Sequence, residues 1–205
     1  MIPLTVDKAS IFRAAGIGLG LPSIFLFFYK RVSEDPGVYL EFTNDLSDRQ
    51  PDREFVLEHS VEAGVELAFA WRFRTDIATW NDPPAVFQLD GPFAEGSSGR
   101  TLMPGREPLV WRIRDLQAGR SFAIEMPLDR ATLRFEWRLS AISDGRTKLT
   151  QRIVLSGSSA AEYREQVRAG FAANHAAGME RIAASMEAAQ RAMAEPASGL
   201  DRQTS

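Results

Sequence analysis

The sequence contains no cysteine and only two histidines, His59 and His175, and these absences restrict its chemistry. Without cysteine, the chain forms no disulfide scaffold, carries no thiol nucleophile and cannot bind zinc through thiolates. A zinc site would need carboxylates for its remaining ligands, and a Ser-His-Asp triad would have to recruit one of the two imidazoles. We therefore expect neither a metal nor a cofactor.

The chain also lacks a strong excess of charge. Its 205 residues include 24 Lys and Arg against 27 Asp and Glu, a formal net charge of −3, so no positive field attracts nucleic acid. No Walker sequence is present, and GIGLG at 16–20 lacks the preceding strand of a dinucleotide-binding fingerprint. The hydrophobic content of 44% fits one globular domain plus an appendage.

Residues 1–52 form an N-terminal unit with an apolar segment and a linker. Residues 14–29 are uncharged, but sixteen residues span only about 24 Å as a helix, short of a hydrocarbon core of roughly 30 Å. Four interpretations stay open: a membrane anchor over residues 11–32, a cleaved signal peptide, an appendage docked on the domain, and a start codon assigned too far upstream. We expect cytoplasmic localisation, with membrane association through this segment as the alternative; the oligomeric state is left open.

Residues 53–192 predict one α+β domain, followed by a polar tail at 193–205. Residues 54–61 alternate with a period of two, which indicates a strand with one buried face. Helical spacing at 63–73 and a short helical turn at 76–82 follow. Six more strands with close turns, typical of an antiparallel meander, are predicted at 85–91, 100–105, 108–116, 121–128, 131–142 and 146–157. One long helix from about Ser159 to Ala194 covers the dry sheet face.

Charged side chains alternate outward on neighbouring strands. Arg134 and Arg152 share the outer face with Glu58, Glu125 and Glu136. We expect cross-strand ion pairs there rather than an anion-binding patch.

Four stretches carry a family resemblance: HSVEAGVELAFAWRFRTDIATWND, LDGPFAEGSSGRTLMPG, LVWRIRDLQAGRSFAIEMP and LRFEWRLSAISDGRTKLTQRIVLSG. Together they resemble the START/birch-pollen-allergen-like (SRPBCC) superfamily, and within it the polyketide cyclase/dehydrase-like branch. The resemblance implies a helix-grip fold: a curved seven-stranded antiparallel sheet with two short helices, wrapped around a long C-terminal helix. It also implies an apolar cavity for lipids, polyketides or other small hydrophobic molecules. No catalytic motif carries over to this sequence.

Four polar residues are candidates for a site. His59 shares its strand face with inward residues and is either a general base, a group that orients a ligand, or a satisfied core histidine. Gln151 faces inward on the last strand, which in the resembling fold pairs with the first and brings it near His59. Asn174 should face the sheet and reach the ligand, whereas His175 should lie at the cavity edge. Asp76 and Asp82, which flank Trp80, are expected to be surface caps.

Aromatic and sulfur-containing residues should form the wall of the cavity. The predicted wall consists of Trp80, Phe87, Met103, Trp111, Phe122, Phe135, Trp137 and Phe171. The leading hypothesis is a binder or carrier of a small hydrophobic molecule. One alternative is a polyketide cyclase or dehydratase in which His59 is the acid/base and Gln151 or Asn174 holds the carbonyl. The other is a membrane-tethered interaction domain.

Overall fold

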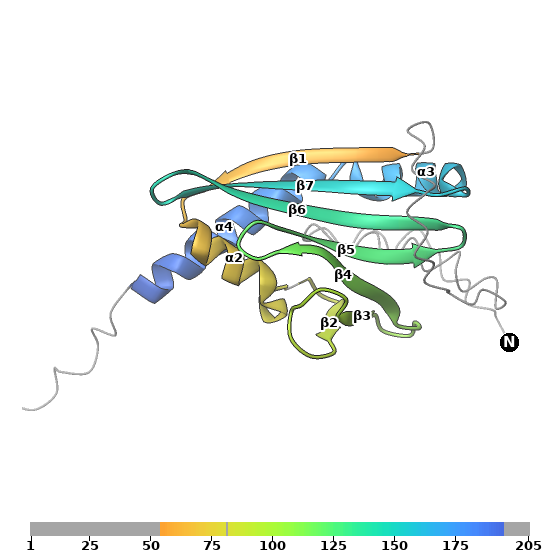
Figure 1. Cartoon of the computed structure of the whole chain (residues 1–205), viewed down its shortest axis with the longest axis horizontal. Coiled ribbons are helices and arrows are strands. Elements are labelled where there is room, and N and C mark those ends of the chain that lie inside the picture. The colour runs from red at the N-terminus through yellow and green to blue at the C-terminus, as the bar shows by residue number, and fades with distance from the viewer. Residues whose placement is uncertain (1–53, 81, 195–205) are drawn as a thin grey trace, which may run out of the picture.

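The computed structural model describes residues 54–80 and 82–194 (Figure 1). The predicted apolar segment 11–32, its linker and most of the polar tail lie outside these residues. No helix within the described ranges has the length and apolar character needed to span a membrane.

Seven antiparallel strands form a single sheet in the spatial order β1-β7-β6-β5-β4-β3-β2 (Figure 1). They are β1 (Phe55–Ala63), β2 (Val86–Leu89), β3 (Ser98–Leu102), β4 (Leu109–Gln117), β5 (Ser121–Leu128), β6 (Ala131–Ser143) and β7 (Arg146–Ser156). Consecutive strands from β2 to β7 are neighbours because short turns connect them. The first strand then pairs with the last, which confirms the predicted seven-stranded sheet.

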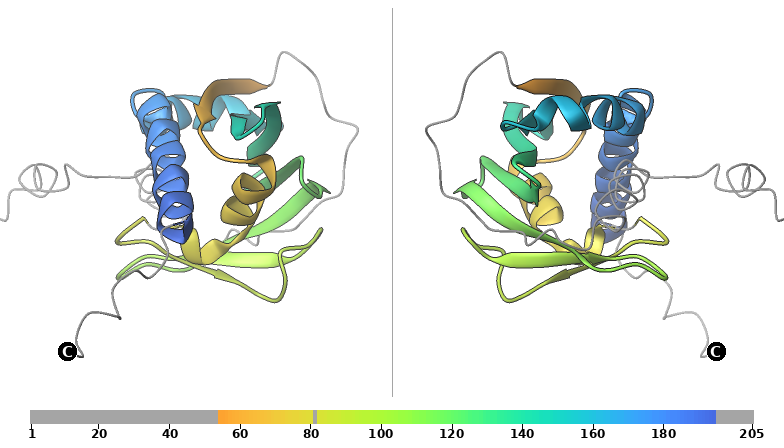
Figure 2. Two further views of the ribbon diagram at one scale, coloured as in Figure 1. Left: turned by 90° about the vertical axis from the view of Figure 1, so that its left-hand side faces the viewer. Right: turned by 90° about the vertical axis from the view of Figure 1, so that its right-hand side faces the viewer.

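Two short helices separate β1 from β2: α2 (Leu67–Thr75) and the 3₁₀ helix η3 (Ile77–Thr79). Asp76 caps η3, since its side chain accepts a hydrogen bond from the Ala78 amide. Figure 2 shows the curved sheet with α2 and the C-terminal helix α4 (His175–Ala194) on its concave side. The fold therefore matches the predicted helix-grip arrangement.

The predicted continuous helix from Ser159 to Ala194 is wrong in one respect. It is divided into α3 (Ala160–Phe171) and α4, which run in clearly different directions (Figure 2). The Asn174 amide donates to the Phe171 carbonyl, while the Asn174 carbonyl accepts from the Gly178 amide and so begins α4. Asn has low helix propensity and is favoured at helix N-caps, which accounts for the interruption.

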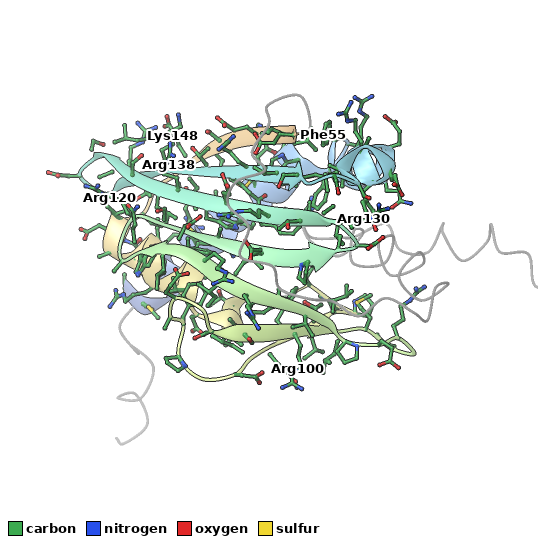
Figure 3. All side chains as sticks on the ribbon, turned by 45° about the vertical axis from the view of Figure 1, so that its right-hand side comes forward. Phe55, Arg100, Arg120, Arg130, Arg138 and Lys148 are labelled. Atoms are coloured by element: carbon green, nitrogen blue, oxygen red, sulfur yellow. The ribbon has the colours of Figure 1, made fainter. Side chains whose placement is uncertain are left out.

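Burial divides the sheet into a dry and a wet face, as the alternation predicts. Leu133, Phe135, Trp137 and Leu139 of β6 are buried on the inner face. The outer face carries the expected cross-strand ion pairs: Arg152 contacts Glu58 at 3.3 Å and Glu136 at 3.0 Å, and Arg134 contacts Glu125 at 3.4 Å. Arg138 and Lys148 are exposed on this face (Figure 3).

Candidate ligand-binding cavity

A small cavity lies between the inner face of the sheet and α2. Its volume of about 20 Å³ is room for roughly one water molecule. The lining residues are Arg74, Trp80, Phe87, Trp111, Ile124, Phe135 and Trp137. Five of the eight predicted wall residues are among them, and the lining comes from α2, the end of η3 and strands β2, β4, β5 and β6.

Aromatic rings fill the space around this cavity. The Trp80 ring meets Phe87 edge-on at 5.5 Å between centroids and lies 5.8 Å from Trp111. Phe93 contacts Phe122 edge-on at 5.0 Å, and Phe122 stacks on Trp137 at 6.3 Å. Cavities that hold small organic ligands usually measure about 300–1,000 Å³, so the aromatic wall closes this one against such a ligand.

Gly99 positions one part of the wall. It pairs with Trp111 across β3 and β4, and a Cβ built on it would lie 2.1 Å from the Trp111 ring. The indole Nε1 donates to Thr101 Oγ1 at 3.1 Å. The missing side chain of Gly99 therefore lets the Trp111 ring lie directly over the neighbouring strand.

Arg74 is a functional candidate that the sequence reading missed. Its side chain is only 3% exposed, and its guanidinium lies 4.1 Å from the Trp137 ring centroid and 5.4 Å from that of Trp80. The buried Nε has no hydrogen-bond partner, and the guanidinium forms no ion pair within the described part of the chain. Burial lowers the pKa of Arg74 to about 9, so it is still cationic at pH 7.

The helical spacing of residues 67–74 indicates that Arg74 faces inward. Leu67, Ala70, Trp71 and Arg74 fall at i, i+3, i+4 and i+7, which places the arginine on the apolar side of α2. Arg72, two residues earlier, is exposed.

A second polar group lies beside the cavity: His59 of β1, Gln151 of β7 and His175 at the start of α4. His59 and Gln151 are directly paired across the two strands, which confirms their predicted proximity. The Gln151 amide, however, bonds to His175: its Oε1 is 3.0 Å from the imidazole Nε2. The His59 and His175 rings are 5.9 Å apart.

His175 is buried, with 9% of its surface exposed, rather than lying at the cavity edge as expected. Desolvation, and secondarily the neighbouring His59, lowers its pKa to about 4, so it is neutral at pH 7. Asn174 is exposed, and the prediction that it faces the sheet is wrong. His175 lies four residues after the buried Phe171, so it falls on the inner side, whereas Asn174 does not.

The remaining predicted site residues take other positions. Phe171 packs on Phe135 at 5.4 Å, and Met103 is buried at the end of β3; neither lines the cavity. Phe122 stacks on Trp137, and neither Phe122 nor His59 lines the cavity. Asp82 is buried, which corrects its expected role as a surface cap.

No family model and no curated protein matches this chain in sequence. Solved structures do match its fold. The Zhui aromatase/cyclase from Streptomyces sp. R1128 is 19% identical over 70% of this chain and 99% of that chain, with a TM-score of 0.55. A point mutant of Thalictrum flavum norcoclaurine synthase with a transition-state analogue is 10% identical over 67% and 96%, with a TM-score of 0.54. Protein NE0264 from Nitrosomonas europaea is 11% identical over 68% and 97%, with a TM-score of 0.50. The described domain therefore shares the helix-grip fold of these solved structures.

Proposed function

We propose that this chain binds a small, largely aromatic molecule that carries an anionic oxygen, held between the sheet and α2 with Arg74 as its polar anchor. The observation that carries the proposal is the buried guanidinium at the cavity, which lies over the Trp137 ring and near Trp80 and has no acidic partner among the described residues. The aromatic lining supplies flat apolar surface, and Arg74 supplies the charge that selects the ligand.

The energetics of Arg74 support a ligand of this kind. Burial lowers the pKa of Arg74 well below its ordinary value, to about 9, which corresponds to a cost on the order of 5 kcal/mol for burying the charge. A desolvated cation–π contact returns about 2 kcal/mol, and the more distant Trp80 contributes less than Trp137. A carboxylate, phenolate or enolate oxygen beside the guanidinium would recover the rest through charge-assisted hydrogen bonds.

Binding requires the aromatic wall to open, because the cavity of about 20 Å³ is far smaller than any such ligand. Phe87 and Phe93 are the side chains best placed to move. Both are partly exposed, and both meet the Trp80 ring edge-on, at 5.5 Å for Phe87 and 6.4 Å for Phe93 between ring centroids. The similar structures include an aromatase/cyclase and a complex with a transition-state analogue, which supports small-molecule binding by this architecture.

The test compares 2-naphthoate with its neutral analogue 2-naphthamide, titrated into the full chain and followed by tryptophan fluorescence. We expect the carboxylate to bind at least about tenfold more tightly. That preference should vanish in Arg74→Met and persist in Arg72→Met, which removes the same charge from the exposed side of α2. Equal affinity for the two compounds in the native protein would refute the anchor role of Arg74.

A cyclisation or dehydration reaction is the second proposal, because a buried cation beside a cavity is suited to stabilise an enolate oxygen. Hydrogen–deuterium exchange at the central carbon of a 1,3-diketone tests it. Exchange accelerated by the native protein but not by Arg74→Met would support this chemistry. Unchanged exchange in a folded His59→Ala variant would remove His59 from the mechanism.

A further inference from the structure

One row of inward-facing side chains crosses four strands from the cavity to the histidine pair. Phe122 of β5 is opposite Trp137 of β6, Trp137 is opposite Gln151 of β7, and Gln151 is opposite His59 of β1. The Arg74 guanidinium lies over the Trp137 ring in this row. A flat molecule bound at Arg74 therefore has the Gln151 amide beside it, one strand further along the sheet.

The Gln151 side chain has hydrogen-bonding capacity that no described residue uses. It is 2% exposed, and its Oε1 is engaged with His175 Nε2 at 3.0 Å. Its Nε2 carries two N–H groups and is buried without a partner among the described residues. A primary amide with one satisfied end and one orphaned buried donor is uncommon in folded proteins, and it indicates a missing acceptor.

We propose that Gln151, held by His175 and flanked by His59, is a second polar subsite that binds an uncharged hydroxyl or carbonyl oxygen of the ligand. This inference rests on the proposed function, since it assumes that the anionic end of the same molecule binds Arg74. His175 orients the amide by fixing its oxygen, which leaves the nitrogen to donate.

The chemistry of the subsite favours a neutral oxygen over a second carboxylate. His175 is uncharged at pH 7, and the amide supplies a dipole rather than a full charge. An ionised group buried here would lose its hydration without gaining a counter-charge from Gln151 or His175. The two subsites therefore differ in kind: one is cationic, the other a neutral donor.

The sheet geometry sets the spacing of the two ligand groups. Neighbouring strands are about 4.8 Å apart, so an anion over Trp137 and an oxygen at Gln151 are separated by roughly 5–10 Å. The opposite ends of a fused two-ring aromatic acid span this separation. The geometry thus favours an acid with a hydroxyl or keto group at the far end of a rigid flat skeleton.

The experiment compares 6-hydroxy-2-naphthoate with 2-naphthoate in the full chain. In the native protein the hydroxylated acid should bind about threefold to tenfold more tightly, the range of one added neutral hydrogen bond. In Gln151→Met, which keeps the length of the side chain, this preference should disappear while 2-naphthoate affinity stays within about twofold. Thr150→Val, on the same strand but the opposite face, should keep the preference.

The outcomes separate the two proposals. If 2-naphthoate binds and the hydroxylated acid gains nothing, the second subsite is refuted and the Arg74 site stands. If neither acid binds, the proposed function fails and this inference fails with it. Should Gln151→Met not fold, ¹⁵N NMR of the native protein decides: only the hydroxylated acid should shift a buried glutamine NH₂ pair, and the absence of that shift refutes the subsite.

Discussion

Lowering the pH from 7 to 5 should destabilise this domain by about 2 kcal/mol through His175 alone. In the unfolded chain this imidazole has its ordinary pKa of 6.5, whereas desolvation and the nearby His59 lower the folded value to about 4. The unfolded state therefore binds the proton more tightly, and stability falls as the pH drops below 6.5. The loss reaches about 3 kcal/mol near pH 4 and levels off below it.

The assay is urea unfolding at pH 7, 6, 5 and 4.5, compared between the native chain and His175→Gln. Glutamine keeps a neutral group that can bond to Gln151 but cannot be protonated in this range. The difference in unfolding free energy between the two proteins isolates the contribution of His175, because every other ionisable group is present in both. The reasoning is refuted if the two proteins lose stability in parallel between pH 7 and 5.

Three further substitutions test individual contacts by the same unfolding measurement. Arg74→Met should stabilise the unliganded protein by about 1–3 kcal/mol, because it removes a buried charge that has no counter-ion among residues 54–80 and 82–194; Arg72→Met should change little, and a destabilised Arg74→Met would contradict this account. Gly99→Ala should destabilise by about 1–3 kcal/mol and alter tryptophan fluorescence, since its Cβ would meet the Trp111 ring at 2.1 Å; unchanged stability would show that the ring moves aside freely. Thr147→Val should destabilise by about 1–3 kcal/mol, because the buried Val65 carbonyl loses its 2.8 Å hydrogen bond, and a neutral result would mean that water replaces the hydroxyl.

The sheet could be predicted from the sequence because one-sided burial leaves a period of two in each strand. In β6, Phe135 and Trp137 alternate with Arg134 and Glu136, and no other regular structure gives that pattern. The pairing of His59 with Gln151 followed from the resemblance, since it requires the first strand to meet the last.

The interruption between α3 and α4 could not be predicted from apolar spacing, because that spacing continues through it. Phe171, His175 and Gly178 are buried at intervals that fit an unbroken helix. The local preference of Asn174 for a helix N-cap outweighs the periodicity there. Arg74 was missed because a charged side chain adds nothing to the apolar periodicity, although its position on α2 points inward.

The volume of the cavity was the least predictable property. Residues that fill a core and residues that line a cavity have the same composition and the same periodicity. Whether Trp80 and Trp111 enclose a ligand or each other depends on side-chain packing, which leaves no trace in sequence spacing.

The pairing of β1 with β7 has a consequence for the order in which the domain assembles. Ser60 bonds to Thr150, 90 residues further along the chain. At a synthesis rate of about 5–20 residues per second, β1 waits roughly 5–20 s on the ribosome before its partner strand exists. The closure of so long a loop also slows refolding of the complete chain, since non-local pairing must offset its entropy before it stabilises anything. During synthesis, His59 can therefore meet Gln151 and His175 only after all the strands of the β2–β7 meander have been made.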